Sequence, residues 1–251
     1  MATLTYYGHS TWALETKNAN VVIDPFFTGN PSFTGDRDAA IKGATHILVT
    51  HGHADHIGDT VAIAEKTGSM VITNYELASW LAAGGVKRYD PMNTGGTIDA
   101  GGFSVSLTRA YHSAAESAKG LRALKGEDVS KLPDDGVSIP LGHPNGIVVQ
   151  AKGEPTVYHM GDTDVFSDMT LIAELYRPEI VMVPIGDRFT MGAKGAAIAL
   201  HSFVQPRIAI PCHYGTFPIL DQSPDRFIEI MASHGAHIQV KVPRVGVAFE
   251  P

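Results

Sequence analysis

The sequence of 251 residues contains a single cysteine, Cys212. One thiol cannot form an internal disulfide, so the disulfide-stapled folds of small secreted domains are excluded. The N-terminal residues also lack the basic segment and apolar stretch that mark a secretory signal. Both absences favour a reducing compartment, and we expect a cytoplasmic protein.

Basic residues and long apolar runs are also scarce. Lysine and arginine number 19 against 26 aspartates and glutamates, which gives a formal net charge of −7. A phosphate backbone attracts a basic surface, so we expect no nucleic-acid partner. No apolar run approaches the ~18 residues that would span a bilayer, so we expect no membrane segment. A small-molecule substrate is the expected partner, and a homo-oligomer is left open.

The overall composition is that of an ordinary globular protein, with 44% hydrophobic and 18% charged residues. The first half is rich in short strand-like segments and contains two helical ones. The second half alternates strands and helices, at residues 156–160, 167–176, 179–184, 193–203, 207–211 and 224–234. No sharp linker separates the halves. We therefore predict a single domain over residues 1–251, built of sheets flanked by helices.

Three histidines and one aspartate lie within six positions, directly after an apolar strand-like run at residues 46–50. They are His51, His53, Asp55 and His56. Core packing does not require such a cluster, whereas imidazole and carboxylate at short spacing are the ligands of a borderline metal such as Zn²⁺. The cluster therefore predicts a metal site, and it has enough ligands to belong to a two-metal one.

Other polar residues also follow the ends of apolar strands. His112 follows the alternating strand at residues 102–108, and Asp162 and His213 follow two strands of the second half. Strand-end loops carry the chemistry of many α/β folds because a rigid sheet aims them. His112, Asp162 and His213 are therefore the natural complement to the first cluster.

These motifs resemble those of the metallo-β-lactamase superfamily, whose signature is His-x-His-x-Asp-His followed by separate His, Asp and His ligands. The resemblance is closest to an uncharacterised metal-dependent hydrolase family near the ascorbate-6-phosphate lactonases. It covers nearly the whole chain, through residues 8–10, 23–26, 50–59, 91–93, 95–96, 158–163, 189–192 and 213–218. It implies a four-layer αβ/βα sandwich, in which two mixed sheets lie face to face with helices outside and the site lies at one edge.

The resemblance also implies two divalent metal ions as cofactors. Seven ligands would hold them: His51, His53 and His112 for one ion, Asp55, His56 and His213 for the other, and Asp162 as a bridge. We expect zinc, with manganese and iron as alternatives, because all three accept imidazole and carboxylate. The predicted catalytic residues are Asp55, Asp162 and His213.

Two dications close together lower the pKa of a bound water from about 15.7 toward about 7. We expect a metal-bridging hydroxide to attack an ester, lactone or phosphoester bond, while Asp55 orients it or takes its proton. Ligand histidines need an acceptor on their second nitrogen. Asp24 is the candidate for that acceptor, and His9 is a second candidate for the outer shell of the site. The candidates for the substrate pocket are Asp187, Arg188, Tyr214 and Thr216.

Two departures from the superfamily pattern fall near the expected pocket. Ala193-Lys194-Gly195 stands where the family has an acidic residue at a helix start. Residues 113–142 carry no clear period and form a longer segment than is usual in the family. We predict that they form a long loop with at most a short helix, and we hypothesise that this loop is a lid that contacts substrate.

Two other functions remain open. A phosphodiesterase acting on nucleic acid would use the same chemistry, but the acidic charge and the lack of a basic, glycine-rich arm count against it. A non-catalytic metal-binding sensor or scaffold would belong to a different class. The full ligand set argues against that alternative, because a sensor has no need of a site equipped for hydrolysis.

Overall fold

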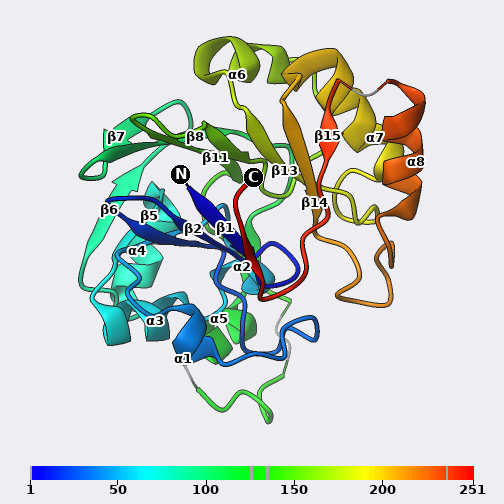
Figure 1. Ribbon diagram of the computed structural model, residues 1–251. Coiled ribbons are helices and arrows are strands. Elements are labelled where there is room, and N and C mark those ends of the chain that lie inside the picture. The colour runs from blue at the N-terminus through cyan, green and yellow to red at the C-terminus, as the bar shows by residue number, and fades with distance from the viewer. Residues whose placement is uncertain (1, 125–126, 134–135, 236) are drawn as a thin grey trace.

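The computed structural model describes residues 2–124, 127–133, 136–235 and 237–251. Two mixed sheets of seven strands each lie face to face, and helices cover both outer surfaces (Figure 1). The predicted fold class, an α/β sandwich with helices outside two mixed sheets, is confirmed.

The first sheet is built mostly from the N-terminal part of the chain. Its strands are β1 (Thr3–Tyr6), β2 (Trp12–Glu15), β3 (Asn20–Ile23), β4 (His46–Leu48), β5 (Met70–Asn74), β6 (Tyr89–Met92) and β16 (Ala248–Phe249). Their order is β16-β1-β2-β3-β4-β5-β6. Pairing is antiparallel from β16 to β3 and parallel from β3 to β6, so β1, β3 and β4 run in the same direction.

The second sheet repeats this plan with later strands. They are β7 (Thr97–Asp99), β8 (Phe103–Arg109), β11 (Asn145–Ala151), β12 (Val157–His159), β13 (Ile180–Pro184), β14 (Ile208–Cys212) and β15 (Gln239–Val240). Pairing is antiparallel from β7 to β12 and parallel from β12 to β15. Because two antiparallel steps separate β8 from β12, the strands β8, β12 and β14 run in the same direction.

Three apolar clusters hold the four layers together. The central one packs residues of the first sheet, such as Leu14 and Ile23, against residues of the second, such as Leu107 and Ile147. The two outer clusters lie between each sheet and its helices. Strands with both faces covered read as continuous apolar runs, which is why β13 was recognisable in the sequence.

The helices differ from the sequence expectations at two places. They are α1 (Arg37–Ala40), α2 (Ala54–Ile57), α3 (Thr60–Thr67), α4 (Tyr75–Ala83), α5 (Ala118–Leu124), α6 (Met169–Tyr176), α7 (Ala193–Ile198) and α8 (Asp225–Ser233), with a π-helical turn η1 (Ala199–Val204). Ile57, Val61 and Ala64 recur at helical spacing, which predicts one helix, but Gly58, whose φ is 40°, divides it into α2 and α3. The helix predicted over residues 193–203 widens from α7 into η1.

The segment at residues 113–142 is more structured than expected. It forms the short hairpin of β9 (Ala115–Ser117) and β10 (Ser138–Pro140), with α5 between the strands. Residues 125–126 and 134–135 of this segment lie outside the described residues. Among the described residues, no helix is long and apolar enough to cross a membrane.

Candidate metal centre

The candidate residues gather where strands of the same direction end. In the first sheet, β1, β3 and β4 are followed by His9, Asp24 and the cluster at residues 51–56. In the second sheet, β8, β12 and β14 are followed by the last three candidates, His112, Asp162 and His213. The face-to-face arrangement of the sheets brings both sets to one edge of the sandwich, and their ligand atoms form groups within 4.8 Å.

His51, His53 and His112 form the first group. The Nδ1 atom of His53 lies 3.0 Å from Nε2 of His51 and 3.2 Å from Nε2 of His112. A neutral imidazole carries one N–H donor and one lone pair, so three inward-facing rings cannot satisfy one another fully. A cation between their lone pairs would satisfy all three.

The second group contains Asp55, His56 and His213, together with His9. His9 is fully buried, and its Nε2 lies 3.0 Å from Oδ2 of Asp55. His56 and His213 present nearly parallel rings with centroids 5.8 Å apart. The arrangement offers one carboxylate and two imidazoles to a second cation, and His9 contacts the carboxylate.

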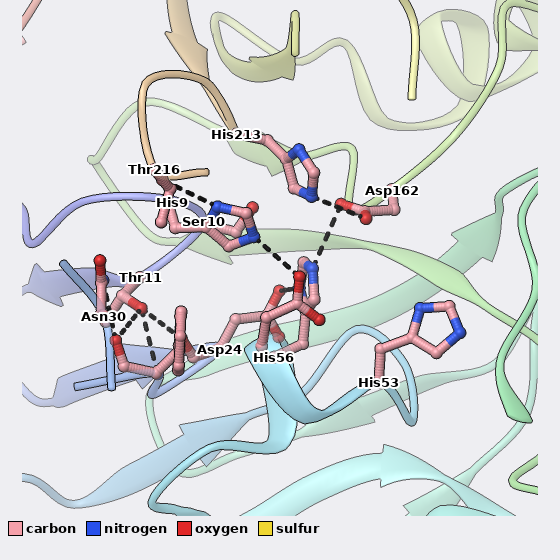
Figure 2. Close-up of polar contacts among 12 residues, drawn as sticks. His9, Ser10, Thr11, Asp24, Asn30, His53, His56, Asp162, His213 and Thr216 are labelled. Atoms are coloured by element: carbon pink, nitrogen blue, oxygen red, sulfur yellow. Dashed lines mark hydrogen bonds and ion pairs between the residues drawn. The ribbon is translucent and has the colours of Figure 1, made fainter. Parts of the chain in front are cut away.

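Asp162 contacts residues of both groups, and Figure 2 shows its carboxylate facing His213 and His56. Its Oδ2 is 3.0 Å from Nε2 of His213, 3.5 Å from Nε2 of His112 and 4.0 Å from Nε2 of His51. Its Oδ1 is 3.3 Å from Nε2 of His56. One buried carboxylate therefore contacts imidazoles of both groups, as a bridging ligand would.

Several polar atoms of the centre are buried without a hydrogen-bond partner among the described residues. They are Nε2 of His56, Oδ1 of Asp162 and Nδ1 of His213. Buried polar atoms without partners are costly and rare in folded proteins. The first two atoms face each other without forming a hydrogen bond, which fits two ligand atoms that share a cation. The donor set of imidazoles and carboxylates suits Zn²⁺ and similar ions.

Both carboxylates of the centre are held ionised. Burial alone would raise the pKa of Asp162, but His213 and His56 outweigh it and hold the pKa well below its ordinary value. Burial likewise acts to raise the pKa of Asp55, and His56 together with the hydrogen bond from His9 lowers it. Both residues are thus carboxylates at neutral pH, as metal ligands must be.

The histidines of the first group are held neutral. Burial lowers the pKa of His51 well below its ordinary value, and it lowers the pKa of His53 and His112 as well. In the second group, burial and the nearby His213 lower the pKa of His9 to about 4. A neutral imidazole keeps one lone pair, so each ring of the first group can serve as a ligand.

His56 behaves differently from the other histidines. Burial acts to lower its pKa, but Asp162 and Asp24 outweigh burial and raise the pKa well above its ordinary value. A metal ion that binds Nε2 of His56 must therefore displace a proton, which makes metal binding sensitive to pH.

Asp24 contacts one candidate ligand directly and a second one through Thr50. Its side chain is fully buried, and Oδ2 lies 2.7 Å from Nδ1 of His56. Thr50 donates to the same carboxylate twice, through its backbone N–H to Oδ1 at 2.8 Å and its hydroxyl to Oδ2 at 2.7 Å. The hydroxyl of Thr50 also lies 3.0 Å from Nδ1 of His51. Asp24 therefore contacts His56 directly and His51 through Thr50, and Thr50 is a residue of this network that the sequence reasoning missed.

Strained backbone accompanies the site. Five non-glycine residues of the site loops have φ between 43° and 58°: His9, Asp24, Asp187, Arg188 and His213. This left-handed region costs roughly 1–2 kcal/mol for a residue with a Cβ, so the surrounding structure must hold it. The backbone N–H of His213, for example, donates to the carbonyl of His9 at 2.7 Å. Such strain gathers where side chains must be aimed.

A cleft of about 580 Å³ opens beside the centre. Two of the candidate ligands, His53 and Asp55, line it, and Glu116 and Ala123 contribute from the 113–142 segment. That segment is anchored, because Leu121 is buried in the outer cluster of the first sheet. The predicted lid is thus a packed wall of the cleft in this structure. Glu116 was not a sequence candidate, since no local pattern marks it.

The four sequence candidates for the substrate pocket do not line this cleft. Asp187 and Arg188 are exposed in the loop between β13 and α7, and Tyr214 is half-buried. Thr216 is buried, and its hydroxyl lies 3.0 Å from Nδ1 of His9. Thr216 therefore reaches the centre through His9.

Comparisons with known proteins agree with this geometry. The family model described as the beta-lactamase superfamily domain matches residues 3–213. A UPF0173 metal-dependent hydrolase of Methylobacterium nodulans is 54% identical, with 98% of each chain covered, and one of Agrobacterium fabrum is 51% identical, with 97% of each covered. The solved structure of Igni18, a metallo hydrolase from the archaeon Ignicoccus hospitalis, is 31% identical with a TM-score of 0.82. It covers 99% of this chain and 98% of its own.

Proposed function

Because this chain belongs to the metallo-β-lactamase superfamily and is a metal-dependent hydrolase, we propose that it uses two metal ions to hydrolyse an ester, lactone or phosphoester bond of a small molecule. One observation carries the proposal. Two groups of ligand atoms lie side by side, and the single carboxylate of Asp162 contacts both.

In this proposal seven residues would hold the two ions: His51, His53 and His112 the first, Asp55, His56 and His213 the second, and Asp162 both. When bound, the ions supply hydroxide at neutral pH and stabilise the negative charge that develops on the oxygen of the attacked group. We propose zinc for both, because five of the seven ligands are imidazoles and imidazole suits that ion.

The outer residues fix which ring nitrogens face the ions. A carboxylate only accepts hydrogen bonds, so Nδ1 of His56 donates to Asp24 and leaves its Nε2 free. The hydroxyl of Thr50 also donates to Asp24, so it accepts from Nδ1 of His51 and leaves that Nε2 free as well. Asp24 thereby sets the tautomer of one histidine in each group.

His9 performs a similar task for Asp55. Its Nε2 donates to Oδ2 of Asp55, and its Nδ1 accepts from the hydroxyl of Thr216. The lowered pKa of Asp55 makes it a weak base. We therefore assign Asp55 the role of orienting the nucleophile and binding an ion, with His9 fixing the direction of its carboxylate.

The single cysteine supports our proposal of a cytoplasmic location. Cys212 is the single cysteine of the chain and is buried as a free thiol, and a reducing compartment keeps such a thiol intact. Fractionation of the source cells, with antibody detection of this chain, tests the location. Recovery with the extracytoplasmic fraction would contradict it.

Metal analysis joined to an activity panel tests the proposed function. We expect two divalent ions per chain in metal-replete protein, and hydrolysis of at least one class among lactones, carboxylic esters, thioesters and phosphodiesters. Asp55→Ala should lower kcat at least about 100-fold, the loss expected when a catalytic group is removed. Circular dichroism of the variant should show that the fold persists.

The possible results separate the candidate functions. Metal content well below two ions per chain would contradict the binuclear centre. Protein that holds two ions and hydrolyses nothing on the panel would favour a metal sensor instead. Glu229→Ala provides a control, because Glu229 is exposed on α8 and does not line the cleft, and its variant should keep wild-type turnover.

A further inference from the structure

The cleft beside the proposed metal centre is largely apolar beyond the ligands. Its apolar lining comes from both aromatic and aliphatic side chains: Phe26, Val61, Ala62, Ala123 and Phe217. Such a surface gains free energy by covering hydrocarbon and gains nothing from a hydrated, charged group. The cleft is therefore shaped for an apolar part of a substrate that extends away from the scissile bond.

Besides the candidate ligand Asp55, two carboxylates line the cleft, Asp59 and Glu116. They differ in how many of their oxygens already have hydrogen-bond or ion-pair partners. Asp59 is occupied, because its Oδ1 pairs with Nη1 of Arg37 at 2.8 Å. Its Oδ2 accepts from the backbone N–H groups of Phe27 and Thr28 at 3.0 and 2.8 Å. Asp59 thus holds the loop after β3 and offers little charge to a ligand.

Glu116 is the carboxylate that remains available. It lies half-buried on β9, and one oxygen, Oε1, accepts from the backbone N–H of Ser117 at 2.6 Å. We find no hydrogen bond or ion pair to its other oxygen among the described residues.

We propose that the cleft binds a substrate whose non-reacting part is apolar and carries a positive charge, and that Glu116 pairs with that charge. The inference rests on the proposed function and narrows it to substrates with a cationic group on their non-reacting part. An anionic group at the same place would face Glu116, and no lysine or arginine of the described residues lines the cleft. Charge complementarity of this kind selects between ligands of equal shape.

Three p-nitrophenyl esters of matched length test the charge. One has a trimethylammonio-butanoyl group, the second has the tert-butyl isostere of that group, and the third is a glutaryl monoester. Metal-loaded wild-type protein should show kcat/KM for the cationic ester about fivefold above the isostere, as expected for a partly exposed ion pair. The glutaryl monoester should be the poorest of the three.

Glu116→Gln isolates the residue. The variant should lose the preference for the cationic ester through a higher KM, while kcat/KM of the tert-butyl ester stays at the wild-type value. Glu127→Gln is the matched control, because Glu127 lies on the same segment and pairs with Arg122 at 2.7 Å on the surface. The control should keep the preference. The inference would be overturned if Glu116→Gln lowered kcat/KM equally for all three esters. It would also be overturned if wild-type protein preferred the glutaryl ester.

A wrong proposed function can be distinguished from a wrong assignment of Glu116. If no ester is turned over by protein with two bound ions, hydrolysis of esters is refuted, and the cleft is tested by calorimetric binding of trimethylammonio-butanol and its tert-butyl isostere. Tighter binding of the cationic alcohol that disappears in Glu116→Gln would uphold the inference. Equal binding of the two alcohols by wild-type protein would overturn it.

Discussion

A single buried carboxylate, Asp24, links candidate ligands of both groups. Asp24 has no exposed side-chain surface, and its hydrogen bonds go to Thr50 and His56. Burying an ionised carboxylate is costly unless its partners compensate. Here the partners are a ligand of one group and, through the hydroxyl of Thr50, a ligand of the other. The proposed metal centre therefore explains the position of Asp24 better than core packing does.

Thr50→Val tests this link while keeping the shape of the side chain. Loss of the hydroxyl removes the acceptor for Nδ1 of His51 and one donor to Asp24. Removal of such outer contacts lowers metal affinity about 10- to 100-fold. We expect a loss of this size in competition with a chelator of known affinity.

Thr50→Ser is the matched control, because it restores the hydroxyl, and it should recover most of the affinity. Wild-type affinity in Thr50→Val would show that the hydroxyl has no part in orienting His51. A loss that is equal in both variants would point to packing of the methyl group instead.

At the scale of elements, the sequence predicted the strands that have one or two covered faces. The strand at β4 reads as an apolar run and β8 as an alternating one, and each precedes a proposed ligand. The edge strands β6, β7, β15 and β16 were not predicted, because they are short and partly exposed and so carry a weak pattern. The fold class followed from the order of elements together with the resemblance to a known superfamily.

The hairpin of β9 and β10 could not be predicted for a different reason. Its pairing joins Ser117 to Ser138 across a helix, so nothing local marks it. Candidate ligands, in contrast, stood out by residue type and by their place after strands. Glu116 and Thr50 were missed because their roles depend on which neighbours the fold brings to them.

The loop that carries His51 and His53 packs against the 113–142 segment at Gly52. A Cβ at this position would lie 2.6 Å from Cβ of Leu141 and 3.0 Å from the carbonyl oxygen of Ala114. Either the wall of the cleft or the backbone between His51 and His53 must then shift. The absence of a side chain at Gly52 thus lets one element hold the ligands while the other closes the cleft.

Gly52→Ala should therefore affect stability and substrate binding together. Overpacking of this kind costs about 1–3 kcal/mol, and displacement of the cleft wall should raise KM for any substrate that fills the cleft. Gly195→Ala is the control, since a Cβ there meets Met191 at 3.5 Å, an ordinary contact inside a helix. Thermal unfolding and steady-state kinetics provide the readouts. Wild-type Tm and KM in Gly52→Ala would show that the segment moves freely, as a lid would.

At the scale of the whole molecule, the proposed ligands come from both sheets. The cluster at residues 51–56 follows the first sheet, whereas His112, Asp162 and His213 follow strands of the second. Bound ions would therefore join the two halves of the sandwich at one edge, beside the apolar core that already joins them. Binding to the folded state alone stabilises it by about 2.7 kcal/mol when free metal is 100 times its dissociation constant. Metal removal should accordingly lower the Tm of the whole chain.

The metal-free protein should also lose stability as the pH falls. His9, His51, His53 and His112 have folded-state pKa values below their ordinary value of about 6.5. Between about pH 7 and about pH 4 the unfolded chain therefore binds more protons at these four positions, and the free energy of unfolding decreases on acidification. His56 has a raised pKa, so its contribution is present below about pH 6.5 and is lost as the pH rises through its folded-state value.

His46, His159 and His201 also have lowered pKa values, so seven histidines oppose one, and the expected net effect is destabilisation by acid. Urea unfolding of chelator-treated protein at about pH 7.5 and about pH 5 measures it, and the midpoint should be lower at the acidic pH. Metal-loaded protein should show a larger decrease between the same two conditions, because protons compete with the ions for the ligand nitrogens. Equal midpoints for the metal-free protein at both pH values would mean that these rings are not held neutral by burial.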